Sequence, residues 1–226
     1  MVTTRKIEVA LPPLENGDRL TRDEFEARYA AMPDLKKAEL IEGVVYLASP
    51  VRVNHHSQPH GTLNSWLGVY HLLTPGVMIC DNSTVRMDEE NEPQPDTLVR
   101  IEQGGSSRIT SDDYLEGAPE LAIEVAGSSA AYDFHDKMEV YRRNGVQEYI
   151  IWNSRERSLS WFALRSDEYI ALEPDESGII RSQVFPGLWL NVDAFVAGDL
   201  ALVYKTLQNG IADESHKAFV SKLSQN

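Results

Sequence analysis

The sequence is poor in cysteine and in basic residues, and each shortage excludes a class of protein. Cys80 is the only cysteine among 226 residues, so the chain cannot form an internal disulfide or a zinc site built from several thiolates. Lysine and arginine number 21 against 35 aspartate and glutamate residues, which gives a net charge of -14. This balance argues against a protein that coats nucleic acid through its overall field, so any nucleic-acid contact has to be local.

Long apolar runs are missing as well. No segment approaches the roughly 20 apolar residues that span a bilayer, and residues 1–10 lack the apolar run of a signal peptide. We therefore expect a cytoplasmic protein without a membrane segment. A chain of this length, 42% hydrophobic and 25% charged, is sufficient for one large domain with its own core.

Three helices are predicted, at residues 21–33, 57–73 and 130–144. Thr21 and Glu24 give the first a capping-box pattern. Asn54 or a neighbour is expected to cap the second, and the Ser128-Ser129 pair the third. Each helix has apolar residues at helical spacing on one face, which is expected to be the side turned toward the core.

Strand patterns fill the segments between the helices. A hairpin is predicted at residues 38–48, with Glu42-Gly43 as its turn. Short apolar runs at residues 77–80, 85–87, 97–101 and 121–126 favour a central mixed sheet, followed by a strand at 149–152 and a meander over 158–172. The acidic run at residues 88–92 is expected to be a solvated loop. Alternating helices and strands predict an α/β fold.

Two acids stand out because they lie in or beside apolar strands. Asp96 directly precedes the predicted strand at 97–101, and Glu124 lies inside the strand at 121–126. An ionised carboxylate in such a place is costly unless a cation, a hydrogen-bond donor or water compensates it. Magnesium favours oxygen ligands and is often held by one or two carboxylates, so these acids are candidate metal ligands.

Lys137 lies in the helix that follows the Glu124 strand, near the buried edge of that helix. From there an ammonium group could orient or activate an attacking water and offset negative charge on a phosphorus centre. The alternative is structural: Lys137 forms a salt bridge with Glu124 or Asp133, and the protein holds no metal.

A series of short motifs, taken in order, resembles the Uma family of restriction endonucleases. These motifs are Glu39-Leu40-Ile41-Glu42-Gly43, Ser49-Pro50 before a histidine-led helix, Pro95-Asp96, Pro119-Glu120-Leu121-Ala122-Ile123-Glu124-Val125, Asp133, Lys137, Tyr141 and Gly145-Val146-Gln147-Glu148-Tyr149. The family looks like a branch of the PD-(D/E)XK nucleases. The resemblance covers residues 21–189 and implies a restriction-endonuclease-like core, a mixed central sheet flanked by helices, with Asp96 and Glu124 as metal ligands.

One departure from the superfamily pattern concerns its lysine. That residue would fall two positions after the second acid, where this chain has Ala126, so its role would pass to Lys137. Glu39 is the next candidate, because an acid ahead of the main pair often assists metal or water binding in such nucleases. Alternatively, Glu39 is an exposed acid of the hairpin and has no role in the site.

His56, His60 and Tyr141 are possible auxiliary residues. The two histidines lie four residues apart and could contact a phosphate or ligand near the site. They also resemble a zinc pair, although polar residues at a helix start are the simpler reading. Tyr141 is expected to pack in the core with its hydroxyl group near the edge of the site.

The leading hypothesis is therefore an endonuclease that uses Mg²⁺, or Mn²⁺, to cut phosphodiesters, most plausibly in DNA, and that pairs as a homodimer. We divide the chain into an N-terminal arm (1–20), a nuclease-like domain (21–190) and partly helical C-terminal segments (191–226). A local basic strip would contact the nucleic acid, formed by Lys36, Lys37, Arg142, Arg143, Arg155 and Arg157. The alternatives are a catalytically silent interaction or regulatory module on the same fold, and hydrolysis of a small phosphodiester.

Overall fold

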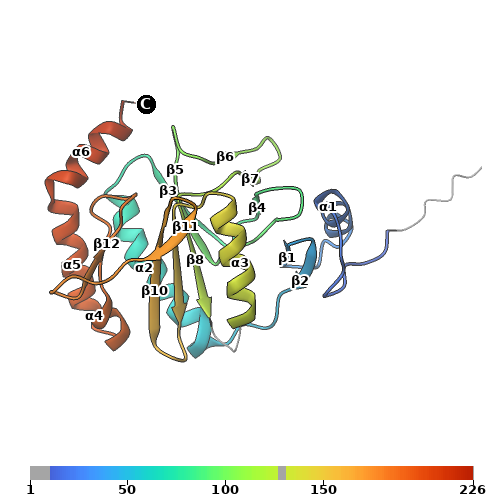
Figure 1. Cartoon of the computed structure of the whole chain (residues 1–226), viewed down its shortest axis with the longest axis horizontal. Helices are drawn as coiled ribbons and strands as arrows, with labels where there is room; N and C mark the ends of the chain where they lie inside the picture. Colours follow the sequence, from blue (N-terminus) through green and yellow to red (C-terminus); the bar gives the residue numbers. More distant parts are fainter. Residues whose placement is uncertain (1–10, 127–130, 226) are drawn as a thin grey trace, which may run out of the picture.

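The structure is a computed structural model that describes residues 11–126 and 131–225 (Figure 1). Its centre is a six-stranded sheet in the order β11-β10-β9-β8-β5-β3. The strands are β3 Val77–Asp81, β5 Thr97–Ile101, β8 Leu121–Ala126, β9 Glu148–Asn153, β10 Ser158–Arg165 and β11 Glu168–Ala171. Strands β8 and β9 pair in parallel and the other neighbours are antiparallel, which confirms the predicted mixed sheet.

Helices cover both faces of this sheet. Because side chains alternate across a strand, Ile123 of β8 points into a core shared with Leu63 of α2 (Gln58–Leu72). Ala122 points to the other face and packs with Tyr141 of α3 (Ala131–Arg143). Helix α3 is also the crossover that joins the parallel strands β8 and β9. Glu124, two residues beyond Ala122, is thereby directed to the α3 face.

The second helix begins where it was predicted, but its predicted cap is wrong. A π-helical turn, Val53–Ser57, precedes α2, and Ser57 at the N-cap makes no side-chain capping bond. Asn54 lies inside that turn and therefore does not cap the helix. The first helix, α1 Arg22–Ala30, has the expected capping box between Thr21 and Glu24. The expected caps of α3, Ser128 and Ser129, lie outside the described residues.

Three small sheets accompany the central one in the described residues, one of them formed by β12 (Ile179–Arg181) and β13 (Trp189–Asn191). The predicted hairpin is present as β1 Ala38–Ile41 and β2 Val44–Leu47, and Glu42 and Gly43 adopt positive φ in its turn. Residues 85–86 form β4, which pairs with β7 (Leu115–Glu116) and not with the central sheet as expected. Strand β6 (Arg108–Ile109) completes that sheet. Two-residue strands have no readable periodicity, which explains the error.

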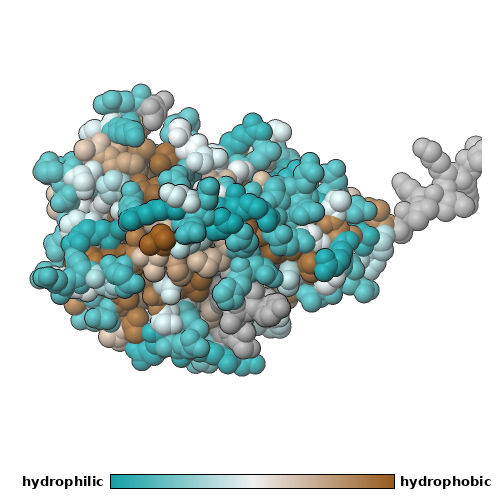
Figure 2. All heavy atoms as spheres, viewed as in Figure 1, coloured by the Kyte–Doolittle hydropathy of each residue, from teal (hydrophilic) through white to brown (hydrophobic). Residues whose placement is uncertain are grey.

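The C-terminal elements belong to the main core. They are β12 Ile179–Arg181, β13 Trp189–Asn191, α4 Val192–Ala197, α5 Leu200–Ala212 and α6 Glu214–Leu223. Phe195 and Leu207 pack in the same cluster as α2 and the sheet. None of the described helices is long and apolar enough to cross a membrane. Figure 2 shows hydrophilic residues over most of the visible face, with smaller hydrophobic areas between them.

The acidic run at residues 88–92 is not fully solvated, because Glu92 is 1% exposed. Its backbone N–H donates to Leu40 O at 2.8 Å, which fixes the residue against β1 and turns its side chain inward. Oε2 of Glu92 has no hydrogen-bond partner among the described residues. Burial, with the nearby Glu26 carboxylate adding to it, raises the pKa of Glu92 from 4.5 to about 8.

Glu92 should therefore make folding stability fall as the pH rises from about 4.5 to about 8. In this window the folded protein keeps a proton that the unfolded chain releases, so a rise in pH favours unfolding. We expect Glu92→Gln to exceed the parent in stability by about 1 kcal/mol or more at pH 9, roughly one pKa unit, and to match it near pH 5. Urea unfolding measures this, with the exposed Glu89→Gln as control. Identical pH profiles for parent and Glu92→Gln would contradict the account.

Candidate active site

Sheet register brings the two predicted acids together. Thr97 of β5 lies opposite Ile123 of β8 in an antiparallel pair, so Asp96 and Glu124 are the next cross-strand neighbours. Each residue is only 5% exposed. The backbone N–H of Val125 donates to Asp96 Oδ2 at 2.8 Å, which fixes the first carboxylate beside the strand that carries the second.

Helix α3 supplies the partners of Glu124. Lys137 Nζ and the Tyr141 hydroxyl group both donate to Glu124 Oε1, each at 2.9 Å. The two donors are four residues apart and so lie on one face of the helix. Lys137 Nζ is also 2.7 Å from Glu39 Oε1 on strand β1. The lysine thus bridges two carboxylates, one from the hairpin and one from the central sheet.

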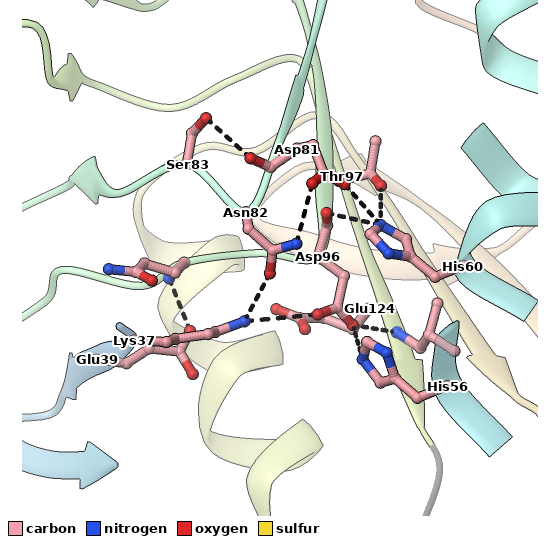
Figure 3. Close-up of polar contacts among 12 residues, drawn as sticks. Lys37, Glu39, His56, His60, Asp81, Asn82, Ser83, Asp96, Thr97 and Glu124 are labelled. Carbon is pink, nitrogen blue, oxygen red and sulfur yellow. Dashed lines mark hydrogen bonds and ion pairs between the residues drawn. The ribbon is translucent and has the colours of Figure 1, made fainter. Parts of the chain in front are cut away.

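Two side chains contact the Asp96 carboxylate, one a lysine and one a histidine (Figure 3). His56 Nε2 lies 3.2 Å from Asp96 Oδ2, and Lys37 Nζ lies 3.5 Å from Asp96 Oδ1. Lys37 also donates to the side-chain oxygen of Asn82 at 3.2 Å. Figure 3 shows Lys37 and Glu39 approaching from one side and His56 and His60 from the other, with the two acids between them.

His60 supports the strand that carries Asp96. Its Nε2 atom is 2.9 Å from Asp96 O and 2.8 Å from Thr97 Oγ1. The rings of His56 and His60 meet edge to face, with centroids 5.7 Å apart. Within the described residues, no three His, Cys, Asp or Glu side chains are already arranged to hold a metal ion. In this structure His56 contacts the side chain of Asp96 and His60 contacts its backbone carbonyl.

Proton affinities in the cluster reflect burial and these contacts. For Asp96, burial would raise the pKa, but the His56 hydrogen bond and the Lys37 charge lower it well below its usual range. The hydrogen bond to Asp96 raises the pKa of His56. Burial raises the pKa of Glu124, with Asp96 and Glu39 adding to the effect against the opposing charge of Lys137. Burial also disfavours the Lys137 charge, yet Glu124 and Glu39 raise its pKa.

These groups open onto a cleft of about 1150 Å³. Its acidic lining residues are Asp96 and Glu124. Its basic and histidine lining residues are Lys36, Lys37, Arg52, His55, His56, His60, Lys137 and Arg155. A chain of net charge -14 therefore concentrates positive charge around two carboxylates in one cleft.

Only part of the predicted basic strip lines this cleft. Lys36, Lys37 and Arg155 do so, whereas the other three arginines lie elsewhere. Arg142 pairs with Glu139, and Arg143 pairs with Glu42. Arg157 donates to Val196 O beside a second, smaller cavity. Neighbouring acids thus take up the charges of Arg142 and Arg143.

Lys37, Asn82 and Arg52 are residues of the site that sequence reasoning did not single out. Lys37 is one of the six residues of the predicted basic strip, and its contact with Asp96 joins residues 59 positions apart. Asn82 adopts positive φ directly after β3. Asparagine tolerates this conformation well, so an asparagine at the end of a predicted strand was the one feature that could have indicated a turn there. No local sequence pattern indicated that Arg52 would line the cleft.

The donor set fits a divalent cation. Asp96 and Glu124 offer carboxylate oxygens, the ligands that magnesium prefers, and both line the open cleft. Glu124 in particular is buried, so its ionised form needs a nearby cation. Lys137 supplies that charge in this structure, and a metal ion beside both acids would add to it.

The chain thus has an α/β fold in which two cross-strand acids and a helix-borne lysine meet at the end of a mixed sheet. The crystal structure of a putative nuclease from Anabaena variabilis ATCC 29413 has a similar fold, with a TM-score of 0.56 and 14% sequence identity over 85% of this chain and 99% of that one. The chain belongs to the Uma2 family, described as "Putative restriction endonuclease", whose sequence profile matches residues 22–193. No curated protein matches the sequence.

Proposed function

We propose that the protein is a metal-dependent nuclease that hydrolyses phosphodiester bonds, with DNA as the first substrate to test. The observation that supports this most directly is the cleft, where Asp96 and Glu124 meet across β5 and β8 and cationic side chains surround them. Carboxylates that hold a metal, with basic groups that hold phosphate oxygens, are what phosphodiester hydrolysis requires. Membership of the Uma2 family supports the same reading.

Asp96 and Glu124 would hold Mg²⁺ or Mn²⁺. When bound, such an ion supplies Lewis acidity toward a phosphoryl oxygen and makes a nearby water a better nucleophile. Lys37 and His56 offset the Asp96 charge in this structure, and Tyr141 fixes the rotamer of Glu124 through its hydroxyl group. Glu39 would support the cluster by holding Lys137 in place.

Lys137 would act through its charge and its hydrogen bonds, not as a base. Its pKa is raised because Glu124 and Glu39 outweigh the effect of burial, so the amine keeps its proton at neutral pH. A protonated amine donates hydrogen bonds to a water or a phosphoryl oxygen, and it stabilises negative charge that develops there. Of the two roles that the sequence left open, orienting the water and deprotonating it, the first is the one that we propose.

Lys37 would bind phosphate at the wall of the cleft. We expect Lys37→Ala to weaken nucleic-acid binding and to reduce the slope of log affinity against log salt by about 1, because one phosphate contact is lost. Filter binding at several salt concentrations measures this. Lys217→Ala on α6 is the matched control, because it removes the same charge from an exposed site that does not line the cleft. Equal slopes for Lys37→Ala and the parent would argue against a phosphate contact.

Incubation of the purified chain with single- and double-stranded DNA and RNA tests the proposed activity. Cleavage is expected with Mg²⁺ or Mn²⁺ and should stop in EDTA. If a folded preparation cuts none of these substrates with either ion, the nuclease proposal fails.

One observation favours the second candidate, a catalytically silent module. Lys137 already bridges Glu39 and Glu124, as a purely structural ion-pair network would. Such a module would bind neither divalent ion, and this separates it from the nuclease.

A homodimer is also part of the nuclease proposal. Leu200, Leu202 and Tyr204 on α5 are 48%, 41% and 48% exposed, which leaves apolar surface for a second copy. Light scattering measures the oligomeric state, and a monomer alone at micromolar concentration would contradict the proposed homodimer.

A further inference from the structure

A second cavity lies on the other side of the π-helical turn from the cleft. Its volume is about 370 Å³, within the range of roughly 300–1,000 Å³ found for small-ligand pockets. His55 and Ser57 line the cleft, whereas Asn54 and Gln58 line the second cavity. One turn of backbone thus forms a wall of both.

The spacing between the two cavities is fixed by a hydrogen bond. The Ser154 hydroxyl group donates to His55 O at 2.6 Å and ties the turn to the end of strand β9. Ser154 itself lines the second cavity, and the next residue, Arg155, lines the cleft. Two segments, residues 54–58 and 154–155, therefore contribute consecutive residues to both cavities. The two cavities are for that reason immediate neighbours.

The second cavity has an aromatic base and polar walls. Trp152 and Phe195 line it and pack edge to face, with ring centroids 5.1 Å apart at 78°. Asn54 and Gln58 are exposed residues four positions apart that both line it, and the Gln58 carboxamide donates to Thr62 Oγ1, also in the lining, at 3.1 Å. Arg157 completes the lining, and its guanidinium group donates to Val196 O.

These groups have the chemistry that recognises a nucleobase. Carboxamides pair with the donor and acceptor edges of bases, and aromatic rings and guanidinium planes stack on their faces. The phosphodiester backbone, by contrast, matches the cations of the neighbouring cleft. A nucleotide with its phosphate in the cleft would have a base within reach of the second cavity.

We propose that the cavity lined by Asn54, Gln58, Trp152 and Arg157 is a subsite for one nucleobase of the substrate, next to the phosphate in the cleft. This rests on the proposed nuclease function and narrows its substrate. A base can enter the cavity only when it is unpaired or turned out of the duplex stack. The preferred substrate is therefore single-stranded or locally unpaired, with a base preference beside the cleaved bond.

Free nucleosides test the subsite without phosphate or metal. Adenosine, cytidine, uridine and inosine are titrated separately into the full-length chain in EDTA, and the indole N–H resonances of the four tryptophans are followed by NMR. Trp152→Phe identifies the Trp152 signal. We expect at least one nucleoside to shift that signal at millimolar concentration, with affinity at least fivefold lower in Asn54→Ala/Gln58→Ala.

Gln208→Ala is the control, because it removes an exposed amide on α5 that does not line the cavity. Gln58→Glu is a second test, since it keeps the shape of the side chain and removes its donors. The proposal is overturned if no nucleoside moves the Trp152 signal, or if the double variant binds as tightly as the parent.

The outcome is separable from that of the cleavage assay. Cleavage of nucleic acid without nucleoside binding would contradict the proposed subsite and support the proposed nuclease activity. Nucleoside binding that depends on Asn54 and Gln58, without any cleavage, would support the proposed base-binding site and contradict the proposed nuclease activity.

Discussion

Asp96→Asn is expected to lower the rate of metal-dependent cleavage by about 10²–10³-fold, the range found when one group that stabilises transition-state charge is removed. The amide has the shape of the carboxylate, and its oxygen can still accept from the Val125 N–H. What is lost is the negative charge that would hold the ion. Glu124→Gln should have a similar effect, since both acids are predicted to bind the same cation.

A gel-based cleavage assay in Mg²⁺ and in Mn²⁺ measures this loss. Asp23→Asn is the control, because Asp23 is an exposed carboxylate in the first turn of α1 and does not line the cleft. Circular dichroism confirms that each variant is folded. Retention of more than about a tenth of the parent rate in both site variants would contradict the assignment of these acids.

Lys137→Met is expected to destabilise the fold by about 3–5 kcal/mol, the range found when one partner of a buried ion pair is removed. Glu39 and Glu124 would then face each other with no cation between them. Without the Lys137 charge, nothing on α3 opposes the rise in the pKa of Glu124 that burial causes, so the folded variant holds a proton there at a pH where the unfolded chain has released it. The loss should accordingly be larger at pH 8 than at pH 5, because the folded protein then binds protons that the unfolded chain releases.

Chemical unfolding of the parent, of Lys137→Met and of Lys137→Met/Glu39→Gln tests this. The double variant leaves the buried Glu124 carboxylate without the neighbouring charge of the partly buried Glu39, and it should recover part of the lost stability without recovering cleavage. A change below about 1 kcal/mol in Lys137→Met would mean that the ion pairs contribute no more than an exposed pair does. The proposed role of Lys137 as the charge that organises this cluster would then be wrong.

Local patterns predicted most elements of the fold. Helix α2 follows from Leu63, Trp66, Leu67 and Tyr70, all of which are buried. Strand β8 is an apolar run with all six residues buried, and Glu124 was conspicuous within it for that reason. The π-helical turn and the two-residue strands β6 and β7 were not predicted, because too few residues define them for any period to be read.

The composition of the site depended on contacts between distant residues. Register between β5 and β8 makes Asp96 and Glu124 neighbours, and no local pattern specifies register. The bridge from Lys137 to Glu39 joins residues 98 positions apart. Conversely, the sequence grouped Arg142 and Arg143 with Lys37 by charge alone, whereas Glu139 and Glu42 neutralise them in the structure. The sequence was sufficient to predict several residues of the cluster and the helix or strand that positions each. It was not sufficient to predict which residues contact one another.

Titration calorimetry with Mn²⁺ tests most directly whether Asp96 and Glu124 bind one divalent cation. The parent chain should give heat that fits a single class of sites, and that heat should vanish in both Asp96→Asn and Glu124→Gln. No heat from the folded parent, or undiminished heat in the two variants, would contradict a metal site at these acids.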